Sequence, residues 1–317
     1  MGSGYWSTDV YDAADRYRRA TGKSAFSYSD SGARTVHPAL DPRDAVRESR
    51  DSAEHPQSTP IAVLFDVTGS MGHVPRVLQA KLPQLLGLLL RQGYARDPQI
   101  MFGAIGDATC DRVPLQIGQF ESDNRMDDDL GRIVLEGGGG GQLTESYELA
   151  LYFMARHTVT DHWEKRRRRG YLFIIGDELA YPRVKVREVR RLIGDDLHEN
   201  MPVRQIVDEV TRRWDTYYLL PAGSAHAGSR KVLDFWRSLL GQHAVELDDL
   251  DAVCETIALT VGLGEQAIDL DEGLHDLDRA GSTAARTVSR ALAPLGGRRA
   301  VTALPSAPSD GSGGTRR

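Results

Sequence analysis

The sequence predicts a single α/β domain in which a doubly wound, mainly parallel sheet carries helices on both faces. Short apolar runs typical of buried strands alternate with longer segments of helical periodicity. Three of the apolar runs end at an acid, namely Asp66, Asp107 and Asp177. Because parallel strands end at the same edge of a sheet, and such folds bind ligands at that edge, we expect these acids to share one site.

The composition is that of a globular protein. The chain has 317 residues, 40% of them hydrophobic and 26% charged. With 45 acids against 39 bases, its net charge of −6 predicts no binding to nucleic acid or to an anionic membrane. The most apolar run, residues 82–90, is too short to span a bilayer, and the N-terminus lacks the apolar core of a secretory signal. Cys110 and Cys254 are too few for a disulfide framework. We therefore expect a cytoplasmic protein.

The first half of the predicted fold contains two strands separated by a buried helical region. Residues 60–66 (PIAVLFD) form the first strand, and residues 99–107 (QIMFGAIGD) form the second. Between them, residues 72–93 have leucines on more than one helical face, and Pro83 should kink or break this helix. A short edge strand at 113–120 and a short helix at 127–136 follow.

The second half repeats the alternation. A helix is expected from about Thr144 (LTESYELALYFMARHT), followed by a strand at 170–178 (GYLFIIGDE) and a helical region that continues to Trp214. The remaining predicted elements are a strand at 216–221, a helix at 229–241, a strand at 244–249 and a helix at 250–263.

Composition also divides the chain into three parts. Residues 1–58 are polar with scattered aromatic side chains, and we expect this arm to pack on the core rather than to be fully disordered. Residues 59–263 contain the strand and helix alternation and form the core domain. Residues 264–317 are rich in small residues, proline and glycine. We expect them to be largely disordered, with a marginal helix over residues 265–280.

The loop after the first strand has the composition of a metal site. In residues 66–72 (DVTGSMG), the oxygen-bearing side chains of Asp66, Thr68 and Ser70 alternate on a tight turn, so that they can face one point. A hard divalent cation such as Mg²⁺ takes about six oxygen ligands in octahedral geometry. Glycines allow the backbone to turn closely. Because hydroxyls are neutral, they leave a bound cation able to attract a further carboxylate from a partner.

Two other chemistries use similar loops. Aspartic proteases have Asp-Thr-Gly or Asp-Ser-Gly in direct succession in an all-β fold, whereas here Val67 separates Asp66 from Thr68. The segment also resembles the phosphorylated Asp-Lys-Thr-Gly-Thr loop of P-type ATPases, which require transmembrane helices. Haloacid dehalogenase relatives would place a second acid where Thr68 stands, as their proton donor. Neither class fits this sequence well.

The segment from Asp66 to Ser70 resembles the Asp-x-Ser/Thr-x-Ser motif of von Willebrand factor A domains, which begins their metal-ion-dependent adhesion site. In that family a second loop supplies a threonine after a Gly-Gly pair. Here Thr144 follows the glycines at 137–141, with Gln142 and Leu143 between them, and Gln142 or Glu145 are alternatives for this position.

The family's third loop supplies an aspartate after a buried strand. Asp177 occupies that place in LFIIGDE, with Gly176 where many relatives have threonine and with Glu178 as an additional acid. The resemblance covers residues 60–262 and extends to intracellular bacterial members of the family.

The resemblance implies a metal-dependent protein-binding module rather than an enzyme. Mg²⁺ or Mn²⁺ would bridge to an acidic side chain of a partner protein, and bacterial relatives suggest an AAA+ ATPase as a partner. The implied metal ligands are Asp66, Thr68, Ser70, Thr144 and Asp177, and the acids expected just outside them are Asp107, Glu145 and Glu178. Asp107 has the alternative role of a turn or helix-capping residue. Tyr147 and Tyr181 flank the later loops and are expected to line the site.

An enzyme is the alternative function. A cation beside Asp107, Glu145 and Glu178 could activate water for phosphoester hydrolysis, but the sequence places no histidine or lysine as a general base. The basic run at 165–169 (KRRRR) is expected to be a solvated helix end, with a surface-binding patch as the alternative.

Overall fold

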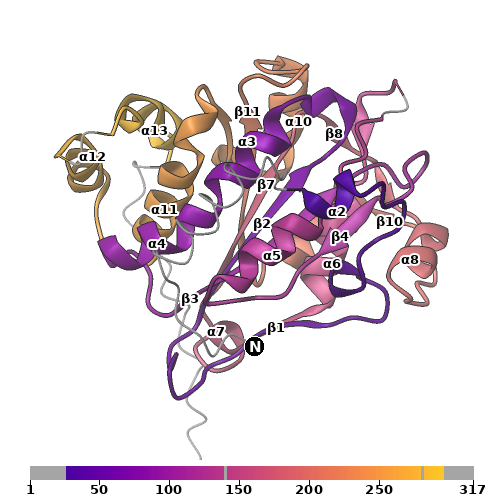
Figure 1. Ribbon diagram of the computed structural model, residues 1–317, viewed down its shortest axis with the longest axis horizontal. Coiled ribbons are helices and arrows are strands. Elements are labelled where there is room, and N and C mark those ends of the chain that lie inside the picture. Colours follow the sequence, from indigo (N-terminus) through magenta and orange to yellow (C-terminus); the bar gives the residue numbers. More distant parts are fainter. Residues whose placement is uncertain (1–25, 139–140, 280–281, 296–317) are drawn as a thin grey trace, which may run out of the picture.

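The computed structural model describes residues 26–138, 141–279 and 282–295. A six-stranded sheet lies at its centre, in the order β12-β11-β7-β2-β3-β4 (Figure 1). Neighbouring strands from β12 to β3 are parallel, and β4 is antiparallel to β3 at one edge. The strands are β2 (Thr59–Asp66), β3 (Pro98–Ile105), β4 (Leu115–Ile117), β7 (Gly170–Ile175), β11 (Trp214–Pro221) and β12 (Ala244–Leu247).

The strand order reverses beside β2. After β2 the chain builds outward through β3 and β4, then returns to place β7 on the other side of β2. Phe65 pairs in register with Ala104 of β3 and with Ile175 of β7. In doubly wound sheets this reversal opens a crevice at the carboxyl ends of the two central strands. Asp66 ends one of these strands, and Asp177 follows the other by two residues.

Helices cover both faces of the sheet, so β2 is buried along its whole length (Figure 1). Side chains alternate along β2, with Ile61, Val63 and Phe65 in one core and Ala62 and Leu64 in the other. The first core is covered by α3 (Val74–Lys81), α4 (Pro83–Gln92), α5 (Arg125–Arg132) and α11 (Val253–Gly264). The second is covered by α6 (Tyr147–Arg156), α8 (Val186–Leu192), α9 (Val203–Val210) and α10 (Arg230–Leu240).

The predicted fold class is confirmed. The helix expected at 72–93 is broken where Pro83 was expected to interrupt it, because α3 ends at Lys81 and α4 begins at Pro83. Within the region expected to be helical up to Trp214, a short antiparallel pair, β9 (Arg183–Val184) and β10 (Met201–Pro202), flanks α8. Within the described ranges, no helix combines the length and the apolar character needed to cross a membrane.

The described part of the N-terminal arm packs on the core. Phe26 and Leu40 are fully buried in the first core. Between them lies α2 (Ser27–Asp30), and beyond them β1 (Arg47–Ser49) pairs in parallel with β6 (Thr158–Thr160), which is followed by α7 (Asp161–Glu164). The aromatic residues Tyr5, Trp6, Tyr11 and Tyr17 lie outside the described residues.

The segment after residue 264 contains two helices, the first where a marginal helix was expected and the second where none was expected. Residues Leu270–Arg279 and Ala285–Leu292 form α12 and α13. Leu277, Val288 and Leu292 are buried in the first core with residues of α11. Their helical spacing gives each helix an apolar stripe, and burial of that stripe outweighs the local abundance of small residues. Residues 296–317 lie outside the described part of the chain.

Removal of one buried side chain from α13 tests this packing. Leu292→Ala should lower the free energy of unfolding by roughly 2 to 5 kcal/mol, because it opens a cavity in the core. Arg286→Ala, at an exposed position of the same helix, should have little effect. Urea denaturation of both variants measures the difference, and equal stabilities would show that α13 does not pack on the core.

Candidate metal centre

Asp66 is the buried centre of the candidate site. Its Oδ1 accepts hydrogen bonds from the Thr68 backbone N–H (2.8 Å) and the Thr68 hydroxyl (2.6 Å), and its Oδ2 accepts one from the Tyr147 hydroxyl (2.6 Å). Burial raises the pKa of Asp66 to about 7, and the charge of Asp177 adds to this effect, against the hydrogen bonds from Thr68 and Tyr147. The hydrogen bonds therefore fix the orientation of the carboxyl, but they do not fully offset the cost of burying its negative charge.

Ser70 connects the first loop to the third. The Ser70 hydroxyl lies 3.3 Å from the Thr68 hydroxyl and donates to Asp177 Oδ1 at 2.7 Å. Asp177 is itself fully buried, and its Oδ2 accepts from the backbone N–H of His226 (3.1 Å). The structure thus brings together four of the five predicted metal ligands through contacts between their oxygen atoms.

The glycine run approaches the same loop through its backbone. The Gly69 N–H donates to the Gly138 carbonyl (2.5 Å), and the Gly137 N–H donates to the Val67 carbonyl (3.3 Å). A Cβ on Gly69 would lie 2.7 Å from the Gly138 oxygen, so a larger residue would separate the two loops. This matches the expectation that the glycines allow a close approach of backbones.

Gly176 makes room for Tyr147. A Cβ on Gly176 would overlap the ring and hydroxyl of Tyr147. Tyr147 is fully buried, edge-on to Tyr218 and Trp236, and its hydroxyl reaches Asp66. The departure from the family pattern at Gly176 is thereby explained, because a threonine there would displace the tyrosine that orients the central carboxylate.

Thr144, the fifth predicted ligand, is not part of this set of hydrogen bonds. Thr144 and Glu145 form the short strand β5, which pairs in parallel with β8 (Leu179–Ala180), and α6 begins only at Tyr147. Among the described residues, no hydrogen bond joins Thr144 to the four ligands described above. Gln142 and Leu143 separate Thr144 from the glycines, and its role as a metal ligand stays a prediction.

Asp107 organises a neighbouring polar group. Its Oδ2 accepts from the Gln142 amide (2.5 Å) and the Tyr181 hydroxyl (3.0 Å), and its Oδ1 accepts from the Thr109 backbone (2.7 Å). Burial acts to raise the pKa of Asp107, but these hydrogen bonds outweigh it and lower the pKa. Burial raises the pKa of Tyr181 to about 12, against hydrogen bonds from Thr109 and Thr144. Asp107, Thr109, Gln142 and Tyr181 therefore form one hydrogen-bonded set, the Asp107 group, and Gln142 belongs to it.

Glu145 and Glu178 are buried acids with incomplete hydrogen bonding. One oxygen of each, Oε2, accepts no hydrogen bond from any described residue. Burial raises the pKa of Glu145 to about 10, with further contributions from the charges of Asp66 and Glu178. Burial raises the pKa of Glu178 to about 8, with contributions from Asp66 and Asp177, against a hydrogen bond from Ser70. Both carboxyls therefore lie close to the predicted ligands, as the sequence led us to expect.

His226 is a component that the sequence did not indicate. Its backbone N–H holds Asp177, and its ring Nε2 lies 3.9 Å from Glu178 Oε1. It lies in the loop between β11 and α10, and no motif or ligand-like spacing marks it. Only the placement of β11 beside β7 brings this loop to the site.

These donors fit a hard divalent cation. Carboxylate and hydroxyl oxygens are the ligands that Mg²⁺ and Mn²⁺ prefer. Among the described residues, no lysine or arginine forms an ion pair with Asp66, Asp177, Glu145 or Glu178, and the His226 ring lies 3.9 Å from Glu178. Within the ranges that the structure describes, no group of three or more His, Cys, Asp and Glu residues is arranged to hold a metal ion. A cation here would therefore depend on the carboxylates of Asp66 and Asp177 together with the hydroxyls of Thr68 and Ser70.

Comparisons with known proteins give only distant structural similarity. No protein-family model and no curated protein sequence matches the chain. Among solved structures, the open form of the pilus adhesin SpaC from Lactobacillus rhamnosus GG covers 70% of this chain at 7% identity, with a TM-score of 0.48. Proximal thread matrix protein 1 from the mussel byssus covers 64% of it at 8% identity, with a TM-score of 0.44. This chain spans 31% of the adhesin and 47% of the mussel protein, and these similarities assign it no function.

The buried acid Glu145 predicts a pH-dependent stability. Its carboxyl has a pKa of about 10 in the folded protein against an ordinary value of 4.5. The folded protein therefore holds this proton more tightly than the unfolded chain does. The resulting contribution to the free energy of unfolding is complete below pH 4.5 and is lost as the pH rises toward 10. Glutamine cannot ionise, so Glu145→Gln should flatten the fall in the free energy of unfolding above neutral pH, by up to about 1.4 kcal/mol per pH unit.

Urea denaturation in EDTA at about pH 6 and about pH 9 measures this slope. The control is Glu164→Gln, since Glu164 is exposed and lies outside the site. Equal slopes for the wild type and Glu145→Gln would show that Glu145 does not ionise in a buried environment.

Proposed function

We propose that this protein is a divalent-cation-dependent protein-binding module. Asp66, Thr68, Ser70 and Asp177 would hold Mg²⁺ or Mn²⁺, directly or through water, and the cation would bridge to a carboxylate of a partner protein. The observation that carries the proposal is the chain of contacts from Asp66 through Thr68 and Ser70 to Asp177, which places oxygens from two separate loops side by side.

The charges at the site support a bridging role for the cation. Burial raises the pKa of Glu145 to about 10, so before a cation binds this carboxyl adds little negative charge at neutral pH. The charge of a bound cation would then be balanced mainly by the two aspartates, and its remaining coordination positions would be filled by neutral ligands. A carboxylate from outside is a favourable additional ligand for a hard cation in this situation.

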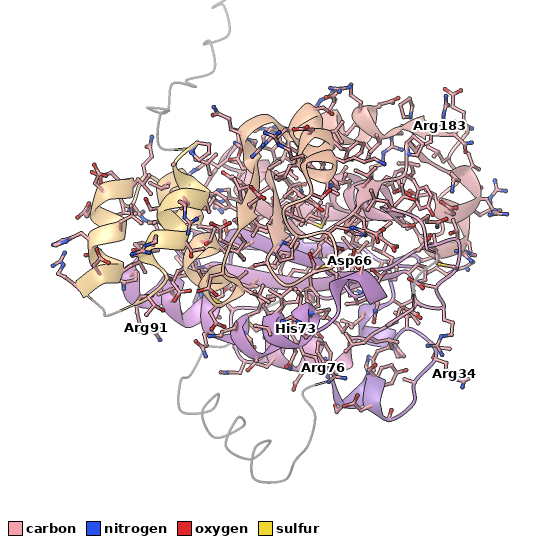
Figure 2. All side chains as sticks on the ribbon, turned by 90° about the horizontal axis from the view of Figure 1, so that it is seen from above. Arg34, Asp66, His73, Arg76, Arg91 and Arg183 are labelled. Atoms are coloured by element: carbon pink, nitrogen blue, oxygen red, sulfur yellow. The ribbon has the colours of Figure 1, made fainter. Side chains whose placement is uncertain are left out.

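The surroundings of the site favour an acidic partner. In the view from above, His73 and Arg76 are the labelled residues nearest to Asp66, and Arg34 and Arg183 lie farther out at the margin of the molecule (Figure 2). All four side chains are exposed. Basic groups around a cation site would steer an acidic surface toward it, an effect that acts mainly on the association rate and weakens with salt. The resemblance to bacterial von Willebrand factor A proteins adds an AAA+ ATPase to the partners we propose.

Titration calorimetry with Mg²⁺ and with Mn²⁺ tests the cation site. Saturable binding is expected for the wild type. Ser70→Ala and Asp177→Asn should weaken it at least tenfold, since even residues that only orient a metal ligand cost about 10- to 100-fold. Thr109→Ala is the matched control, because Thr109 belongs to the Asp107 group. Unchanged cation binding in both site variants would contradict the proposal.

Glutarate serves as a surrogate for the partner carboxylate. It should tighten Mg²⁺ binding by the wild type and should have no effect on Asp177→Asn. Cation binding that glutarate does not change would contradict the bridging role while leaving the metal site intact. The alternative function is a metal-dependent phosphoester hydrolase. It would be favoured if the protein hydrolysed p-nitrophenyl phosphate in the presence of the metal and Asp177→Asn abolished this activity.

A further inference from the structure

The basic run at 165–169 is almost entirely engaged in ion pairs. Four of its five members have an acidic partner contributed by another part of the chain. The pairs are Lys165 with Asp51 (3.2 Å), Arg166 with Asp51 (2.9 Å), Arg168 with Glu265 (2.8 Å) and Arg169 with Asp215 (2.8 Å). Most of the run therefore forms ion pairs that join the end of α7 to the N-terminal arm and to the sheet. Arg167 is the exception.

Arg167 has a different conformation and different contacts. Its φ of +54° lies in the left-handed region, which is uncommon for a residue other than glycine. Its guanidinium lies over the ring of Trp163, 5.8 Å from the centroid. Within the described part of the chain, the Arg167 side chain has no ion pair and no hydrogen bond. The left-handed residue lies in the turn that ends α7, where the Arg167 N–H donates to the Trp163 carbonyl and the Arg168 N–H donates to the His162 carbonyl (3.0 Å each). The Arg167 side chain is exposed.

Arg167 lines a pocket of about 230 Å³ together with a second arginine, Arg213. The Arg213 side chain also lacks an ion pair among the described residues. Trp214 begins β11, so the pocket lies at the amino ends of the strands, opposite the candidate metal centre. Figure 1 shows α7 and β1 at the end of the molecule opposite α10 and β8. The lining residues are Thr158, Val159, Thr160, Trp163, Glu164, Arg167, Arg213 and Trp214.

The two threonine hydroxyls and the Glu164 carboxyl of the pocket already have partners. The Thr158 hydroxyl donates to the Met154 carbonyl (2.6 Å), and the Thr160 hydroxyl accepts from the Trp163 N–H (3.4 Å). Glu164 pairs with Arg50 at 2.7 Å, which compensates its negative charge. Among the described residues, the two guanidiniums are therefore charged groups of the wall without an ion pair, and they lie beside two tryptophans.

We propose that this pocket binds a small organic anion, with a carboxylate or phosphate group held by Arg167 and Arg213 and a planar or apolar body against Trp163. Guanidiniums bind both kinds of oxyanion through paired N–H donors. The pocket is smaller than the roughly 300–1,000 Å³ of typical drug-sized sites, which suits a ligand with a single ring. This proposal is independent of the metal centre, because none of the lining residues belongs to it.

Calorimetry on the full chain tests the pocket with four probes: phenyl phosphate, phenylacetate, inorganic phosphate and the neutral phenylacetamide. We expect saturable binding of phenyl phosphate or phenylacetate, and the tighter of the two identifies the preferred anionic group. Phenylacetamide and inorganic phosphate should bind at least tenfold more weakly, because one lacks the charge and the other lacks the ring. Comparable binding of either one, or no binding of both ring anions, would overturn the proposal.

Variants then assign the binding to the two arginines. Arg167→Gly suits the left-handed backbone and so removes the guanidinium without stressing the fold, and Arg213→Gln removes the second charge. Each substitution should weaken binding of the tighter-binding probe at least tenfold and should leave the melting temperature of the protein unchanged. Arg212→Gln, next to Arg213 but outside the pocket, should bind like the wild type. Probe binding that survives both Arg167→Gly and Arg213→Gln would place the ligand elsewhere and refute the assignment.

Discussion

The structure depends on one constraint, the complete burial of the Asp66 carboxyl at the end of a central strand. A buried carboxylate must be compensated by hydrogen bonds or by positive charge. Thr68 and Tyr147 provide three hydrogen bonds, yet burial still raises the pKa of Asp66 to about 7. The surrounding loops are arranged to hold this group, and the candidate metal centre is the consequence of a charge that the protein alone does not fully compensate.

The constraint extends through the neighbouring elements. Because β2 and β7 are adjacent at the reversal of strand order, the chain after β7 brings Asp177 to the Ser70 hydroxyl. Gly176 then has to lack a side chain, since Tyr147 fills the space beside it. Gly69 has to lack one as well, because the backbone at Gly138 lies against it. The unusual residues of the site therefore follow from the packing around a single carboxyl.

The sequence predicted the parts of the site that strand ends determine. Asp66 and Asp177 were recognisable because apolar runs lead to them and parallel strands share an edge. The spacing could not show that Thr144 would lie in β5, paired with Leu179, because that pairing is a tertiary contact. His226 was missed, because only the neighbouring position of β11 brings its loop to Asp177. The helix α13 was missed because local composition masked an apolar stripe whose burial depends on tertiary contacts.

The central claim is that a divalent cation binds between the Ser70 loop and Asp177. Anomalous diffraction from crystals grown with Mn²⁺ tests it most directly, since the signal locates the ion without reference to activity or to a partner. The account predicts one strong peak within about 2 to 2.5 Å of the Ser70 hydroxyl, as expected for a hard cation and its oxygen ligands. A peak only beside Asp107, or no peak at a saturating Mn²⁺ concentration, would contradict the account.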